Sequence, residues 1–191
     1  MIIGIDVSNN NGLIDWSLVG KSGIGLVMVK ISEGISYQDT FARTNIIGAR
    51  SAGLMVGGYH FARPSVNGAI AEVEFCYKCL QVLPELTLFA LDMEDDQVGA
   101  TVDLAPWSSD WLEHFEDLTG MTSRLYSGPD YIAVHALGGI RSAAKWKLWL
   151  ASWSSHEPTS PWPWQRVNGW QFEAGSTWPG ISSVDLSIWD Y

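Results

Sequence analysis

The sequence contains few cysteines, few positive charges and no long hydrophobic run. Its 191 residues include two cysteines, which cannot form the disulfide framework of a small secreted domain. No apolar stretch approaches the ~20 residues that a membrane-spanning helix needs, so we expect no membrane insertion. The 11 lysines and arginines are outnumbered by 21 aspartates and glutamates, which gives a formal net charge of −10. A chain this negative repels phosphate groups, which argues against nucleic acid as a partner.

Targeting and linker signals are missing as well. The first ten residues, MIIGIDVSNN, have neither a positively charged segment nor a cleavage site, so we expect no signal peptide. No low-complexity stretch or clear linker divides the chain, and hydrophobic residues make up 47% of it. This composition supports a sizeable core, and the length fits one domain. We therefore expect residues 1–191 to form a single domain.

Short apolar segments, bounded by glycine, proline or polar residues, recur along the chain as buried parallel strands do. We predict eight strands, at Ile2–Val7, Leu26–Ile31, Leu54–Phe61, Thr87–Met93, Arg124–Ser127, Leu148–Ala151, Gly169–Phe172 and Val184–Trp189. Amphipathic patterns with capping residues, proline starts or glycine stops lie between the earlier strands. They predict five helices, at Ile14–Val19, Asp39–Ala52, Asn67–Leu83, Pro106–Leu118 and Pro129–Leu137.

The order of these elements predicts the fold. Alternating strands and helices favour a parallel sheet, and eight strands favour closure into a barrel. However, 191 residues is short for a complete (β/α)₈ barrel, and no convincing helix pattern follows Leu148. We therefore predict an α/β fold, an irregular TIM-like barrel of eight strands with about five helices, whose second half is incomplete in helices.

Carboxylates gather where the predicted strands end, which is where such barrels bind ligands. In the run FALDMEDD, Asp92 and Glu94 are two residues apart on a strand, so both side chains point to one face, about 6–7 Å apart along the backbone. Paired carboxylates suit acid–base cleavage of a glycosidic bond, because each raises the pKa of the other. The same spacing also fits a solvated acidic loop. Asp6, at another strand end, either joins the cluster or caps a turn.

Other catalytic motifs are absent from the sequence. Cys76 and Cys79 lie at i, i+3 in a helix pattern, which favours core packing over a redox pair. The four histidines are scattered without metal-ligand spacing, and there is no GxSxG or GxGxxG. We expect neither a metal site nor a cofactor.

Tryptophan is unusually abundant, with 11 residues, ten of them from Trp107 onward. We expect at least half of them in the core. The flat, apolar rings of the others suit the faces of sugars. Trp149 and Trp170, on predicted strands, are candidates for the wall of a sugar cleft.

Eight sequence pieces, in order and covering almost the whole chain, resemble the glycoside hydrolase family 25 lysozymes, the Ch-type muramidases. The pieces are GIDVSNNNGLIDW, VKISEG, GYHFARP, LDMED, LYS, LWLASW, GWQF and VDLS. The family includes many bacteriophage endolysins and bacterial cell-wall hydrolases, and its fold is a barrel of eight strands with about five helices. The chain departs from the family's usual residues at Ile31-Ser32, Trp153 and Ser187, which alters the expected cleft wall.

The resemblance implies an N-acetylmuramidase that cuts the β-1,4 bond between N-acetylmuramic acid and N-acetylglucosamine in peptidoglycan. It makes Glu94 the general acid and Asp92 its catalytic partner, which we expect to assist the substrate's 2-acetamido group, while Asp6 and Asp185 complete an acidic floor. It implies that the sugar cleft is lined by Lys30, Glu33, Tyr59, His60, Tyr126, Trp149, Trp170 and Gln171.

The resemblance also suggests a biological setting. Many relatives carry a wall-binding module after the catalytic domain, whereas this chain ends at Tyr191. We expect a monomeric endolysin that accumulates in the host cytoplasm and reaches the cell wall through a membrane-permeabilising partner. A virion-associated lysin or an extracellular bacterial enzyme is the other setting considered.

Two rival functions use the same barrel. One is a non-catalytic carbohydrate-binding or cell-wall-binding protein, and the other is a chitinase-like hydrolase. The presence of Asp6, Asp92, Glu94 and Asp185 together argues against mere binding, which needs no cluster of mutually repelling charges.

Overall fold

The computed structural model describes residues 1–95, 97 and 102–190. Its strands are β1 (Ile2–Val7), β2 (Leu26–Glu33), β3 (Tyr37–Gln38), β4 (Met55–Phe61), β5 (Phe89–Asp92), β6 (Arg124–Ser127), β7 (Lys147–Ala151), β8 (Gly169–Trp178) and β9 (Ile181–Trp189). Its α-helices are α1 (Trp16–Val19), α2 (Ala42–Ser51), α3 (Ala69–Leu80), α4 (Leu104–Thr119) and α5 (Pro129–Val134). Short 3-10 helices are η1 (Asn9–Asn11), η2 (Leu137–Gly139) and η3 (Ala143–Lys145). Within the described ranges, no helix has the length and apolarity to cross a membrane.

Eight strands close into a barrel. Strands are hydrogen-bonded in the order β1-β9-β8-β7-β6-β5-β4-β2, and β1 also pairs with β2, which completes the ring. The strand pairs are parallel from β1 through β2 and β4 to β8, whereas β9 is antiparallel to both β8 and β1. The eight predicted strands are therefore confirmed. The additional strand β3 pairs with β2 outside the ring, and its two residues are too few to form a recognisable sequence pattern.

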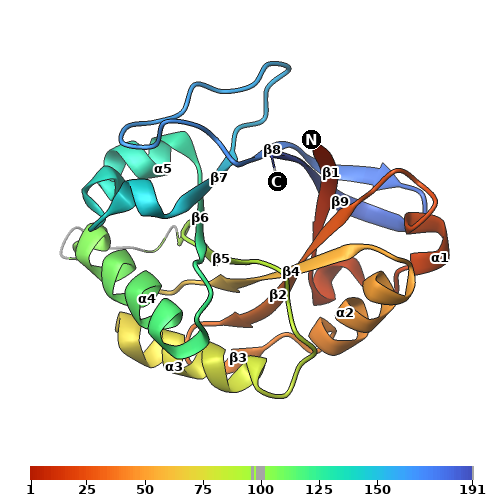
Figure 1. Ribbon diagram of the computed structural model, residues 1–191, viewed down its shortest axis with the longest axis horizontal. Helices are drawn as coiled ribbons and strands as arrows, with labels where there is room; N and C mark the ends of the chain where they lie inside the picture. The colour runs from red at the N-terminus through yellow and green to blue at the C-terminus, as the bar shows by residue number, and fades with distance from the viewer. Residues whose placement is uncertain (96, 98–101, 191) are drawn as a thin grey trace.

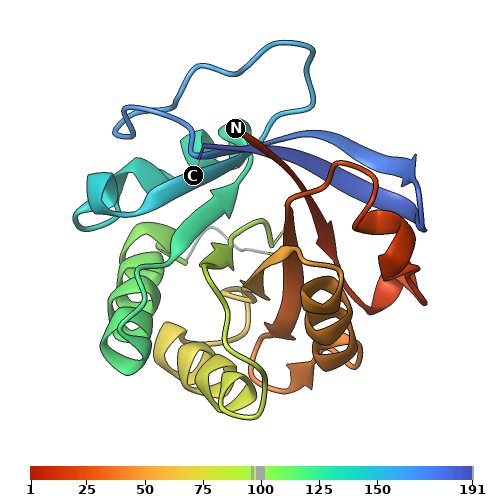
Figure 2. The ribbon, with the colours of Figure 1, turned by 45° about the vertical axis from the view of Figure 1, so that its right-hand side comes forward.

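The helices lie on the outside of the barrel (Figure 1). Helices α3, α4 and α5 each follow one parallel strand, and α2 follows β3. No α-helix follows α5 in the described part of the chain. Instead, a loop over residues 152–168 projects from the barrel and leads into the β8–β9 hairpin (Figures 1 and 2). The prediction of an irregular barrel with five helices and a helix-poor second half is confirmed.

Strand alternation produces two hydrophobic cores. An inner cluster fills the barrel, and its buried members are Leu26, Met28, Leu88, Ala90, Tyr126, Trp149 and Trp189. A larger outer cluster packs the helices against the barrel wall. Trp189 pairs with Ile2 and Gly169, so it fills the end of the barrel where β1 and β8 begin. Gly4 permits this packing, because a Cβ there would lie 2.5 Å from Trp189 Nε1. The barrel is thus plugged at one end, and ligand space remains at the carboxyl ends of the parallel strands.

The cysteines and most tryptophans belong to these cores. Cys76 and Cys79 are buried thiols on α3, which confirms that they pack in the core. Six of the 11 tryptophans are buried: Trp107, Trp111, Trp146, Trp149, Trp164 and Trp189. The expectation that at least half lie in the core is confirmed.

Candidate active site

A cleft of about 330 Å³ opens at the carboxyl ends of the parallel strands. Nine of the twelve predicted site residues line it: Asp6, Lys30, Tyr59, Asp92, Glu94, Tyr126, Trp149, Gln171 and Asp185. These residues come from β1, β2, β4, β5, β6, β7, β8 and β9 and from the segment after β5, so every barrel strand contributes to one polar site.

Sheet register brings the carboxylates together. Asp92, the last residue of β5, pairs with Phe61 on β4 and with Tyr126 on β6. On the other side of the barrel, Asp6 of β1 pairs directly with Asp185 of β9. Glu94 follows Asp92 by two residues and lines the same cleft, as their spacing predicted.

The carboxylates differ in their surroundings. Asp92 is 5% exposed, and its buried Oδ1 atom has no hydrogen-bond partner among the described residues. Glu94 is exposed at the cleft, where it meets incoming groups. Gln171 links the two sides of the site, because its Nε2 donates to Asp6 Oδ2 at 3.0 Å while its Oε1 accepts from Tyr126 OH at 3.0 Å. A buried oxygen without a partner identifies Asp92 as a group that has hydrogen-bonding capacity left for a ligand.

Burial and mutual repulsion raise the pKa of three of these carboxyl groups. The pKa of Asp92 is well above its usual value because of burial and then the charge of Glu94, although Lys30 opposes the shift. The pKa of Glu94 is raised by its partial removal from bulk water within the cleft and then by the charge of Asp185, although Tyr126 and Lys30 oppose the shift. Burial and Asp185 also raise the pKa of Asp6 well above its usual value. Carboxyl groups with raised pKa values stay protonated at a pH closer to neutral, as a general acid must.

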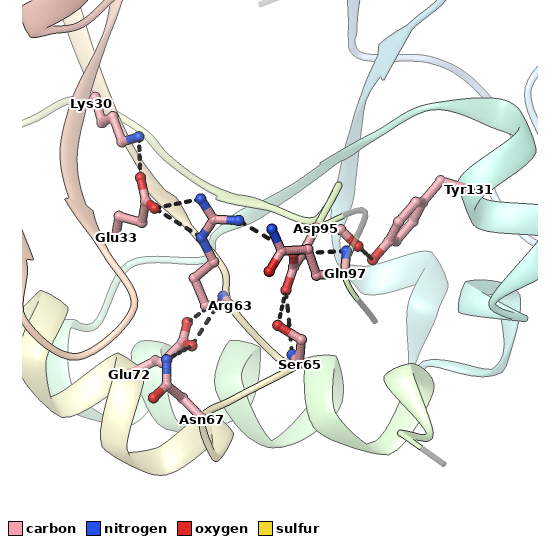
Figure 3. Close-up of polar contacts among 9 residues, drawn as sticks. All are labelled: Lys30, Glu33, Arg63, Ser65, Asn67, Glu72, Asp95, Gln97 and Tyr131. Carbon is pink, nitrogen blue, oxygen red and sulfur yellow. Dashed lines mark hydrogen bonds and ion pairs between the residues drawn. The ribbon is translucent and has the colours of Figure 1, made fainter. Parts of the chain in front are cut away.

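A chain of ion pairs lies next to the site, beside β2 and β4 (Figure 3). Lys30 Nζ donates to Glu33 Oε2 at 2.6 Å, and Arg63 Nε donates to Glu33 Oε1 at 2.8 Å. Arg63 also contacts Asp95 Oδ1 at 3.3 Å, and Ser65 Oγ donates to Asp95 Oδ2 at 2.6 Å. Glu33 thus lies behind Lys30 rather than on the cleft. The chain of contacts anchors Asp95, the residue next to Glu94, while Asp96 falls outside the described residues.

His60 and Trp170 were expected to line the sugar cleft, and the structure places both elsewhere. His60 is fully buried, with Nδ1 2.9 Å from Ser32 Oγ and Nε2 2.9 Å from Glu72 Oε2. Trp170 Nε1 donates to the carbonyl of Ser152 at 2.7 Å. The reason is strand alternation: their neighbours Tyr59 and Gln171 face inward, so His60 and Trp170 face outward.

Other cleft residues escaped the sequence analysis. These are Val7, Ser8, Asn10, Asn11, Phe61 and Ser183. The signal for Phe61 was available, since it lies two residues after Tyr59 and so shares its face. The segment around η1 carries no comparable periodicity, and its position depends on hydrogen bonds such as Asn11 Nδ2 to the carbonyl of Ser183 at 2.9 Å. Across the described ranges, no group of three or more His, Cys, Asp or Glu residues has an arrangement that could hold a metal ion.

A mostly parallel barrel with clustered carboxylates at the carboxyl ends of its strands is the arrangement of a class of barrel enzymes that cleave glycosidic bonds. Comparison with known families agrees with this class. The family model described as "Glycosyl hydrolases family 25" matches residues 5–181. The chain belongs to glycosyl hydrolase family 25.

Individual relatives extend the comparison. The chain is 28% identical over 192 aligned residues to "Lysozyme M1" of Streptomyces globisporus, covering 94% of this chain and 64% of the relative. It is 33% identical over 187 residues to "Autolytic lysozyme" of Clostridium acetobutylicum, covering 96% of this chain and 54% of the relative. It therefore spans between half and two thirds of these relatives' length. Among solved structures, a bacterial lysozyme from Streptomyces coelicolor superposes with a TM-score of 0.89 at 25% identity, over 100% of this chain and 92% of that one.

Proposed function

We propose that the protein is an N-acetylmuramidase, which hydrolyses the β-1,4 bond between N-acetylmuramic acid and N-acetylglucosamine in peptidoglycan. One observation carries the proposal: Asp92 and Glu94 line one cleft, the first buried with an unpartnered oxygen and the second exposed. Two carboxyl groups in different environments match the division of labour in glycoside hydrolysis. The names of the lysozyme relatives support peptidoglycan as the substrate. In this proposal residues 1–191 form one catalytic domain that acts on the bacterial cell wall.

Glu94 is the general acid in this mechanism. It is exposed to the cleft, so its carboxyl group can approach the glycosidic oxygen. Its raised pKa keeps a proton available at a pH where an ordinary glutamate is ionised. Protonation of the leaving oxygen then accompanies cleavage of the bond to the anomeric carbon.

Asp92 assists the substrate rather than attacking it. The 2-acetamido carbonyl oxygen of the muramic acid attacks its own anomeric carbon as the bond to the leaving oxygen breaks, and the acetamido nitrogen gains positive charge. Water then attacks the anomeric carbon, the bond to the carbonyl oxygen breaks, and the Glu94 carboxylate takes a proton from the water. The free Oδ1 of Asp92 is available to orient and stabilise that nitrogen. Asp92 and Glu94 come from one strand and its continuation, whereas a protein nucleophile ordinarily faces the acid across the sugar. Inversion by an activated water and a covalent glycosyl ester are the alternatives.

Stereochemistry distinguishes these mechanisms. We expect net retention, so the β-anomer is the first product formed from a soluble muropeptide oligomer. Proton NMR during the first minutes of hydrolysis measures the anomer before mutarotation. An initial α-anomer would show inversion and would make Asp92 or Asp6 the base for a water molecule. A trapped ester on Asp92 or Asp185 would replace substrate assistance with a protein nucleophile.

Lys30 contributes to the position of the alkaline limb of the pH profile. Its positive charge lowers the pKa of both Asp92 and Glu94, which burial and carboxylate repulsion raise. Lys30→Met removes that charge, so both pKa values rise and Glu94 keeps its proton to higher pH. The alkaline limb of kcat/KM is therefore expected to move to higher pH in Lys30→Met. Lys145→Met is the matched control, since Lys145 pairs with Glu116 on the outer surface. A limb that stays in place or moves to lower pH would contradict this coupling.

Hydrolysis is expected to need no metal ion. The carboxylate cluster is balanced in part by Lys30, and protonation of Glu94 supplies the acid that a Lewis-acidic metal would otherwise provide. Activity on peptidoglycan after dialysis against EDTA should equal that of untreated enzyme. Loss of activity in EDTA that one divalent cation restores would overturn this part of the proposal.

The rival functions give different outcomes in one assay. Release of new reducing ends from purified peptidoglycan, with little release from chitin, is the result expected for a muramidase. Stronger release from chitin would indicate a chitinase-like hydrolase. Binding to peptidoglycan without any release would indicate a carbohydrate-binding protein on the same barrel.

A further inference from the structure

Glu94 lies two residues beyond the end of β5, where the hydrogen bonds of the sheet no longer hold the chain. The last paired residue of that strand is Asp92, which lies opposite Tyr126 on β6. Met93 is still tied to β6, because its amide donates to the Tyr126 carbonyl at 2.9 Å and its own carbonyl accepts from Ser127 Oγ at 2.7 Å. A general acid placed past this point needs a further attachment to keep its carboxyl group over the cleft.

Asp95, the next residue along, supplies that attachment (Figure 3). Its side chain is 1% exposed, and both carboxylate oxygens accept hydrogen bonds. Oδ1 accepts from Arg63 Nη1 at 3.3 Å and from the Gln97 amide at 3.2 Å. Oδ2 accepts from the Ser65 amide at 3.3 Å and from Ser65 Oγ at 2.6 Å. The Asp95 carbonyl also accepts from Tyr131 OH at 3.0 Å, so the residue is held by its side chain and by its backbone.

The charge state of Asp95 sets it apart from the carboxyl groups of the cleft. Burial raises its pKa, but hydrogen bonds from Ser65 and the Gln97 amide, together with the charge of Arg63, bring the pKa below its usual value. The pKa values of Asp92 and Glu94 are shifted in the opposite direction. Asp95 therefore stays ionised and paired, which suits an attachment point and not a group that exchanges protons with a substrate.

The partners of Asp95 are themselves fixed to the outer helices. Arg63 and Ser65 belong to the segment between β4 and α3, and the buried side chain of Glu72 on α3 ties that segment down. The Arg63 amide donates to Glu72 Oε1 at 3.0 Å, and Asn67 Nδ2 donates to the same oxygen at 2.9 Å. Contacts from this segment and from α5 thus reach the residue that directly follows the acid.

We propose that Asp95 is a positioning residue, whose hydrogen bonds to Arg63 and Ser65 hold Glu94 where its carboxyl group reaches the glycosidic oxygen. The proposal rests on the muramidase function proposed above and on Glu94 as its acid. Asp95 itself touches no substrate in this account, and it acts on the rate only through the placement of its neighbour.

Two aryl glycosides of the same disaccharide, N-acetylglucosaminyl-N-acetylmuramic acid, test the proposal. Phenolate is a poor leaving group that needs a proton from the acid, whereas dinitrophenolate departs without one. Asp95→Asn keeps the size of the side chain, but either orientation of the amide points its NH₂ group at donors that Asp95 accepts from. The ratio of kcat/KM on the phenyl glycoside to kcat/KM on the dinitrophenyl glycoside is expected to fall about tenfold in Asp95→Asn.

Three further variants bracket this result. Glu94→Gln removes the acid itself, so its ratio should fall further than that of Asp95→Asn. Ser65→Ala removes the 2.6 Å contact and should lower the ratio less, because the Ser65 amide remains, while Ser65→Thr keeps the hydroxyl and should restore it. Asp117→Asn makes the same change of charge at an exposed position on α4 and should leave the ratio unchanged.

The outcomes separate this inference from the proposed function. A wild-type enzyme that cleaves neither glycoside would remove the muramidase proposal, and an unchanged ratio in Glu94→Gln would remove Glu94 as the acid. With both of these intact, a wild-type ratio in Asp95→Asn would overturn the positioning role. Equal losses on the two glycosides would make Asp95 merely structural and also overturn it. If Asp95→Asn does not fold, the comparison of Ser65→Ala with Ser65→Thr decides, and equal ratios for those two would contradict the proposal.

Discussion

Glu94→Gln is expected to lower kcat on peptidoglycan by about 10²–10⁴-fold, the range typical of a lost general acid, while the fold stays intact. Glutamine preserves the size and hydrogen bonding of the side chain but has no proton to give to the leaving oxygen. Glu94 is exposed at the cleft, so its replacement disturbs no packing. The rate of turbidity loss of a peptidoglycan suspension measures the effect, and circular dichroism checks the fold.

A matched control separates this effect from a general change in charge. Glu74→Gln makes the same substitution at an exposed position on α3 and should leave the rate unchanged. If Glu94→Gln kept a rate close to that of the wild type, Glu94 would not be the acid.

Asp92→Asn is expected to lower kcat by about 10²–10³-fold, the cost of removing one preorganised group that stabilises developing charge. Asparagine retains an oxygen at the buried position but cannot become negatively charged. The carboxyl groups of Asp92 and Glu94 titrate as a coupled pair, and the reactive form in this mechanism is the one in which Glu94 holds the proton and Asp92 is ionised. The expected loss is in kcat more than in KM, because the interaction strengthens as the charge develops. Steady-state kinetics on a soluble muropeptide oligomer measures this division. A variant with unchanged kcat would remove Asp92 from the reaction.

The same variant should be more stable than the wild type at neutral pH. The folded protein raises the pKa of Asp92, so it disfavours the ionised form that the unfolded chain adopts freely. The penalty is absent below the unfolded pKa of about 3.9, grows as the pH rises toward the raised folded pKa, and is fully present above it. We therefore expect a higher Tm for Asp92→Asn at pH 7 and convergence of the two Tm values toward pH 3.5. A lower Tm for the variant at pH 7 would contradict the electrostatic account of the site.

The positions of the barrel strands and the carboxylate pair could be predicted from the sequence because both depend on local patterns. Short apolar runs marked the eight barrel strands, and a two-residue spacing placed Asp92 and Glu94 on one face. Asp6 was a candidate from its place at a strand end, and the family resemblance assigned Asp6 and Asp185 to the acidic floor. Only the paired register of β1 and β9 shows why residues so far apart in sequence meet.

The errors have physical causes. The sequence analysis assigned His60 and Trp170 to the sugar cleft together with their neighbours Tyr59 and Gln171. Adjacent residues on a strand face opposite sides of the sheet, so both members of each pair cannot line the cleft. His60 instead joins a buried contact with Glu72 on α3, a long-range pairing that no local pattern encodes.

The identity of the new reducing-end sugar tests the central claim most directly. Peptidoglycan digested by the protein is reduced with borohydride, and the products are separated and identified by mass spectrometry. A muramidase leaves N-acetylmuramic acid at each new reducing end, so the account predicts N-acetylmuramitol in the digest and its absence with Glu94→Gln. N-acetylglucosaminitol at the new ends, or no new reducing ends at all, would contradict it.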